Sequence, residues 1–118
     1  MQEEGYEVKD IIIESKQLNE HIRQSEAYRQ YLRTKQELYE EPELCRQLQE
    51  FRRRNYELQN KTGINPYDEV KALVTEYDVL LHNSKVSDFL QAEQMVCKMM
   101  QKVFTSITEG LEFDYLNE

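Results

Sequence analysis

The side chains best suited to metal chemistry are few and lie far apart in the sequence. The only histidines are His21 and His82, and the only cysteines are Cys45 and Cys97. A carboxylate-bridged di-metal site in a helical bundle uses a glutamate three residues before each histidine, and neither histidine has one. The cysteines form no C-x-x-C motif, so a zinc site or iron–sulfur cluster built by one chain is not favoured. Although two chains could pool a cysteine each, we expect no metal and no cofactor.

Signatures of catalysis are equally sparse. The chain has three glycines, which form neither a phosphate-binding loop nor the turn that presents a nucleophilic serine. We therefore expect a protein that is not an enzyme.

One acidic residue lies where an uncharged one is expected. Glu93 falls in an apolar stretch beside Leu90 and Val96. A buried, unpaired carboxylate is energetically costly, so Glu93 should be protonated or have a partner. We favour a structural hydrogen bond to a tyrosine, arginine or histidine, and a functional site is the alternative.

The basic run Arg52-Arg53-Arg54 is the one candidate for contact with RNA. Successive residues of a helix point in different directions, which favours three solvated side chains over a single patch. The net charge of −8 also opposes nucleic-acid binding, which depends on releasing counterions from phosphates. We expect direct nucleic-acid binding to be weak or absent.

The element that must position Glu93 and Cys97 is one long helix, predicted over Val86–Gly110. At about 100° per residue its apolar arc is roughly 220° wide, more than a one-sided surface helix needs. One flank should pack on its own chain and the other on a second copy, with Cys97 as a buried, inert thiol. The methionines could serve as core or as contact between chains. The candidate interaction residues are Phe89, Leu90, Glu93, Met95, Val96, Met99, Met100, Val103, Phe113 and Tyr115.

Apolar spacing and capping residues predict the rest of an all-α chain of about five helices arranged in antiparallel hairpins. A first helix covers about 8–23, and Ser25 caps a second, although one continuous helix remains possible. Pro42 opens a third helix, to about Lys61, with Gly63 and Ile64 as its C-terminal cap. Asn65-Pro66 begins a fourth, with Asn65 as N-cap and Pro66 as first helical residue.

We expect a single domain with a flexible lead (1–7), a helical body (8–110) and an acidic, aromatic tail (111–118). Residues Leu111, Phe113 and Tyr115 alternate with acidic residues, so the tail should lie in a groove of its own dimer or dock on a partner. No signal peptide or membrane-spanning stretch is recognisable, and two cysteines fit a reducing cytoplasm.

Several of these segments resemble the YlbF/YmcA family of small helical bacterial proteins, the control-of-competence regulators. The similarity lies in Val86-Ser87-Asp88-Phe89-Leu90-Gln91-Ala92-Glu93, in Ser25-Glu26-Ala27-Tyr28, in Glu41-Pro42-Glu43 and in Leu48-Gln49-Glu50-Phe51, and spans roughly residues 8–111.

The resemblance implies a cytoplasmic, non-enzymatic regulatory protein that forms oligomers, here a homodimer. It implies partners among other members of the family or an RNA-processing complex linked to RNase Y. Some members carry a C-terminal extension with cysteine that is connected with an iron–sulfur cluster, whereas this chain ends LEFDYLNE without one. The alternatives are an RNA-contacting helper that uses the Arg52–Arg54 face and a holdase that uses the methionines.

Overall fold

A computed structural model describes residues 5–61 and 66–113. In these ranges the chain forms six helices and no strand: α1 (Val8–Gln24), α2 (Glu26–Tyr39), α3 (Pro42–Gln59), α4 (Tyr67–Glu76), α5 (Asp78–Leu81) and α6 (Ser84–Thr108). The all-α prediction is confirmed.

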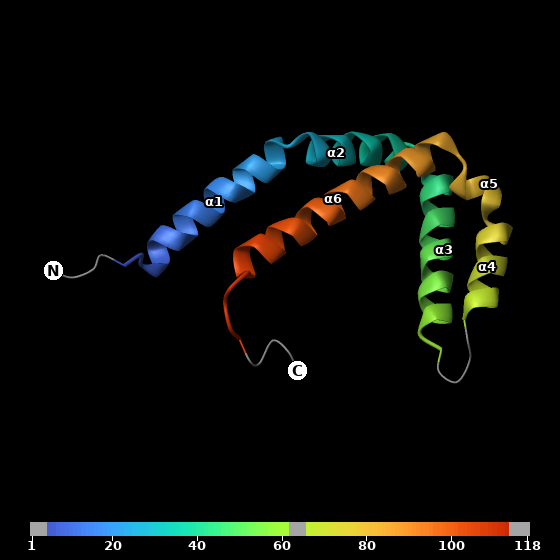
Figure 1. The fold of residues 1–118 in the computed structure, drawn as a ribbon. Coiled ribbons are helices and arrows are strands. Elements are labelled where there is room, and N and C mark those ends of the chain that lie inside the picture. Colours follow the sequence, from blue (N-terminus) through green and yellow to red (C-terminus); the bar gives the residue numbers. More distant parts are fainter. Residues whose placement is uncertain (1–4, 62–65, 114–118) are drawn as a thin grey trace.

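Ser25 separates the first two helices and answers the question of their continuity. Its backbone is extended, at φ −68° and ψ 152°, and its hydroxyl accepts a hydrogen bond from the Tyr28 N–H at 3.2 Å. The same hydroxyl donates to the Ile22 carbonyl at 2.6 Å. One side chain therefore caps both helix ends, and the chain bends between them (Figure 1).

The expected fourth helix is two helices, because the chain breaks at Tyr77. Tyr77 packs its ring on Phe51 of α3, with centroids 5.3 Å apart, and its hydroxyl donates to Glu50 at 3.0 Å. Neither glycine nor proline marks this break, which accompanies contacts with a distant helix. The structure also begins α4 at Tyr67, so Pro66 precedes the helix instead of opening it. The predicted caps Gly63, Ile64 and Asn65 lie outside the described residues.

Helix α6 is fixed at both ends. The Asn83 side chain accepts hydrogen bonds from the N–H groups of Lys85 and Val86, at 3.0 and 3.2 Å. At the other end Gly110 has a φ of 85°, which favours glycine, and the Leu111 N–H bonds the Thr108 carbonyl at 3.0 Å. Helix α6 is thus 25 residues long, the longest in the described part of the chain.

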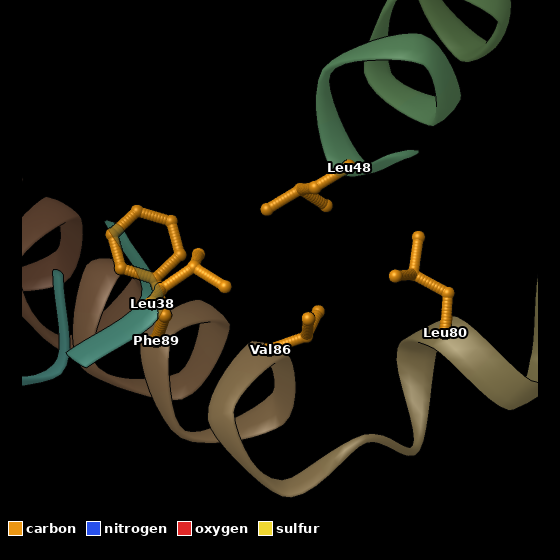
Figure 2. Packing of buried hydrophobic residues seen from close by; sticks show 5 residues of the cluster. All are labelled: Leu38, Leu48, Leu80, Val86 and Phe89. Atoms are coloured by element: carbon orange, nitrogen blue, oxygen red, sulfur yellow. The ribbon is translucent and has the colours of Figure 1, made fainter. Parts of the chain in front are cut away.

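A small core joins four helices at one point. Figure 2 shows its five buried side chains converging from α2, α3, α5 and α6. We call this set the junction core; it consists of Leu38, Leu48, Leu80, Val86 and Phe89. Val86 is fully buried and Leu38 is 1% exposed, so this is the best-covered region of the described chain.

Two parts extend from the junction core in different directions (Figure 1). On one side α3 runs beside α4, and together with α5 they form what we call the head. On the other side α1 and residues 95–108 of α6, which we call the arms, run antiparallel. The molecule measures 67 × 39 × 17 Å, with a radius of gyration of 19.9 Å. A compact chain of this length has a radius near 13–14 Å, so the fold is elongated.

Candidate protein-interaction surface

A hollow of about 510 Å³ lies between the arms. Its apolar lining comes from both arms and from the start of α2, and polar groups of α6 stand among them. We call it the arm groove; it is lined by Leu18, Ala27, Met95, Met99, Val103 and Ile107, with Lys98, Lys102 and Ser106. Because these residues come from three helices, the groove depends on the bend at Ser25 and on the length of α6.

The arms have no core of their own. No residue of α1 is buried, and the buried residues of α6 are Val86, Phe89 and Ala92, all before residue 95. Large apolar side chains remain about half exposed, including Ile11 at 52%, Ile12 at 46% and Ile13 at 55% on α1. Met95, Phe104 and Ile107 of α6 are also more than half exposed. An exposed apolar surface shared by two neighbouring helices is typical of a protein interface.

The candidate interaction residues of α6 divide along the helix. Phe89 is buried in the junction core, and Leu90 packs against that core. Glu93, Val96, Met99, Met100 and Val103 are half-buried, whereas Met95 is exposed. The structure thus places the first two in the chain's own core and leaves the later ones partly open to solvent.

Glu93 has the partner that its position requires. Arg52 of α3 donates to both carboxylate oxygens of Glu93, one of them at 3.3 Å. The Arg52 guanidinium also lies 5.7 Å from the centre of the Phe89 ring. The pair therefore connects the head to α6 at the edge of the junction core, which is the structural role favoured from the sequence.

The other two arginines of the run also face carboxylates. Arg53 pairs with Glu57 within α3 at 3.2 Å, and Arg54 pairs with Glu76 of α4 at 2.7 Å. The hydrogen bond from Arg54 lowers the pKa of Glu76 below its usual value. The three side chains point in three directions, as predicted, and each positive charge has a local negative partner. Nothing in this geometry favours contact with RNA.

The two cysteines lie in different surroundings. Cys45 is half-buried and its Sγ donates to the Leu38 carbonyl at 3.3 Å. Cys97 is exposed, so the expectation that it is buried is wrong for the single chain. It lies on a flank of α6 that no other helix of the described chain covers. Within residues 5–61 and 66–113, no three histidine, cysteine or acidic side chains gather into a metal-binding group.

The tail is described only as far as Phe113. Leu111 is 55% exposed and Phe113 is 37% exposed. Tyr115, the other aromatic residue of the predicted docking segment, lies outside the described residues. The two expectations for the tail therefore stay predictions.

Comparison with known proteins identifies the family. A family model described as control of competence regulator ComK, YlbF/YmcA, matches residues 11–112. The chain belongs to this family. The match takes in the arms, the junction core and the head, so all the helices described above are part of the YlbF/YmcA unit except the first residues of α1. No curated protein and no solved structure gives a significant match.

The family is described as one of regulatory proteins, and it is the same family that the sequence motifs resemble. None of the helices in the described ranges is long and apolar enough to cross a membrane. Sequence reasoning missed the isoleucines of α1 as interface candidates. Their signal was present, because Ile11-Ile12-Ile13 places apolar groups on more than one side of a helix.

Proposed function

We propose that this protein is a regulatory adaptor without catalytic activity that acts by binding other proteins. The observation that carries the proposal is the pair of arms, which present apolar side chains around a groove and bury none of them completely. The YlbF/YmcA family assignment supports a regulatory role. A surface of this kind is suited to another helical protein, because helices recognise grooves through apolar residues three and four positions apart.

The first partner in this proposal is a second copy, giving a homodimer in which α6 takes part. Surface area supports it. The chain has an accessible surface of 9636 Å², against about 6,800 Å² for a compact folded protein of 14.3 kDa. The chain therefore exposes roughly 2,800 Å² more surface than a compact protein of its mass. Covering only half of this excess in a dimer would bury as much surface as one subunit of a permanent homodimer does, which is on the order of 1,000 Å² or more.

The further partners in this proposal are other proteins of the family or a cytoplasmic complex that acts with RNase Y in messenger-RNA processing. This assignment rests on the resemblance of the Val86–Glu93 and Glu41–Glu43 segments to the YlbF/YmcA family. Residues of both segments make contacts between helices. Val86 and Phe89 lie in the junction core, and the Lys85 ammonium of α6 donates a hydrogen bond at 3.0 Å to Glu41, which lies between α2 and α3.

Affinity capture with two matched variants tests the adaptor role. Phe104, on α6, and Val79, on α5, are 63% and 86% exposed, and neither lines the arm groove. A tagged chain should recover RNA-processing proteins or family members from the native cell extract. Phe104→Asp should reduce that recovery at least about tenfold, because a buried charge is costly at an interface, whereas Val79→Asp should leave it unchanged.

Recovery of the same proteins by both variants at equal yield would contradict the placement of the interface on α6. Recovery of no protein above an untagged control would contradict the adaptor role itself. Circular dichroism of each variant shows whether the helices remain intact.

A further inference from the structure

The α6 side of the arm groove is basic, whereas the N-terminal end of α1 is acidic. Residues 95–108 of α6 contain two basic residues, Lys98 and Lys102, and no acidic one. Both lysines stand at the groove. A segment that enters it should therefore carry apolar side chains flanked by carboxylates.

The N-terminal end of α1 has that composition. Residues 7–14 contain Glu7, Asp10 and Glu14 against the single base Lys9, and the apolar run Ile11–Ile13 lies between Asp10 and Glu14. Residue 7 caps the helix, so all of these side chains stand at its exposed N-terminal end. The acidic character is confined to this end, because Lys16 and Arg23 outnumber Glu20 in the rest of the helix. A second α6 would instead bring two more lysines toward Lys98 and Lys102, and this repulsion disfavours it as the occupant.

The lengths and directions of the arms also match. Helix α1 is about 25 Å long and residues 95–108 about 21 Å long, at 1.5 Å per residue. The arms of one chain run antiparallel (Figure 1). A two-fold axis between two such pairs would place each α1 against its own α6 and against the α6 of the other copy. The result is a four-helix bundle, whose interior would take up the apolar side chains that one chain leaves half exposed.

We infer that the arm groove is the binding site for the acidic, isoleucine-rich end of α1 from a second copy of this chain, and that the exchange is reciprocal. The inference rests on the proposed homodimer and adds the element that fills the groove. Each α1 supplies Ile11 and Ile12 to the other copy's groove, where Met99 and Val103 receive them. Glu14 lies near the other copy's Lys98 and Lys102.

A mixing experiment with charge-reversed variants tests the exchange. Lys98→Glu/Lys102→Glu reverses the groove, and Glu14→Lys reverses a charge on α1 without touching the Glu7–Asp10 cap. Each variant alone should dimerise about tenfold more weakly than the parent at low salt, because like charges then face one another. An equimolar mixture should form the mixed dimer in clear excess over the statistical share. In that dimer the two introduced glutamates of one groove face the introduced lysine, and the other groove keeps the original charges.

Native mass spectrometry of differently tagged chains measures the fraction of mixed dimer, and sedimentation measures each dissociation constant. Lys61→Glu/Lys71→Glu, on the head side, makes the same change in net charge as the groove variant and serves as its matched control. It should dimerise like the parent.

A fraction of mixed dimer equal to that of random association would overturn the inference. That result would mean that the lysines of α6 do not face Glu14 of the other copy, because only charges that face one another between chains favour the mixed dimer. A dimer that resists both variants would also overturn it and would leave the proposed homodimer standing on another surface. A parent chain that stays monomeric would overturn the inference together with the homodimer, whereas the adaptor role is decided separately by partner recovery. Ile11→Asp tests the apolar part of the contact. It should abolish dimers, because it places a charge in the other copy's apolar groove, whereas the control Val79→Asp should not.

Discussion

At the scale of the residue, the pair between Arg52 and Glu93 is a polar contact between the head and α6, beside the junction core. Its side chains are 44% and 31% exposed, so water screens much of the attraction. In a double-mutant cycle with Arg52→Ala and Glu93→Ala, we expect a coupling free energy of about 1 kcal/mol or less. Urea unfolding measures it. A coupling well above that would mean that the pair becomes more deeply buried in the assembled protein.

A second prediction at this scale concerns pH. The hydrogen bond from Arg54 lowers the pKa of Glu76 below its ordinary value of 4.5. A carboxylate whose pKa is lower in the folded than in the unfolded state stabilises the protein above the unfolded pKa, and this contribution is lost as the pH falls through the folded pKa. Glu76→Gln should therefore reduce stability at neutral pH and have progressively less effect as the pH falls below the ordinary pKa of 4.5. Thermal unfolding of both proteins across that range measures the difference.

Glu43 also contributes to the pH dependence of stability, but it does so equally in the parent and in Glu76→Gln. Hydrogen bonds from Arg46 and Gln47 lower its pKa to about 2, and it is present in both proteins. An equal effect of Glu76→Gln at every pH would contradict the role given to the Arg54–Glu76 pair.

At the scale of the element, the start of α6 depends on Asn83. Replacing Asn83 by alanine removes the acceptor for two backbone N–H groups and should destabilise the protein by about 1 kcal/mol. Ser84→Ala, one residue later, is the control and should have a much smaller effect. Chemical unfolding of the two variants, compared at one protein concentration, gives the answer. Equal losses would indicate that water replaces the cap without cost.

The sequence predicted elements best where a local signal exists. Ser25, Pro42 and Gly110 mark boundaries through their own backbone and side-chain chemistry, and the structure has boundaries at all three positions. The break at Tyr77 could not be predicted in this way, because it accompanies contacts with Phe51 and Glu50 on another helix.

The candidate site was only partly predictable for a related reason. Apolar periodicity shows that a face of α6 needs cover, but it does not show which element supplies it. Phe89 and Val103 belong to the same apolar arc, yet the first is buried in the junction core and the second lines the arm groove. The expected burial of Cys97 failed similarly, since the described chain has no helix on that flank.

At the scale of the whole molecule, the junction core and the arms should respond differently to truncation. Phe89→Ala creates a cavity within one chain and should cost about 3–5 kcal/mol at any protein concentration. Val103→Ala should cost less in the isolated chain, because Val103 is only half-buried there. Its effect should grow as the protein concentration rises into the range where the proposed dimer would form.

Unfolding curves at several concentrations distinguish the two effects. Concentration-dependent losses for Phe89→Ala alone would place that residue in an interface between chains.

The bend at Ser25 also has a consequence for the lifetime of the protein in the cell. Beyond it, α1 has no buried residue to hold it, so in a lone chain this helix should open readily and offer proteases an early cleavage site. An assembled copy would be protected at the same place. Degradation would then remove the copies that find no partner and match the amount of the protein to the number of complexes it can join.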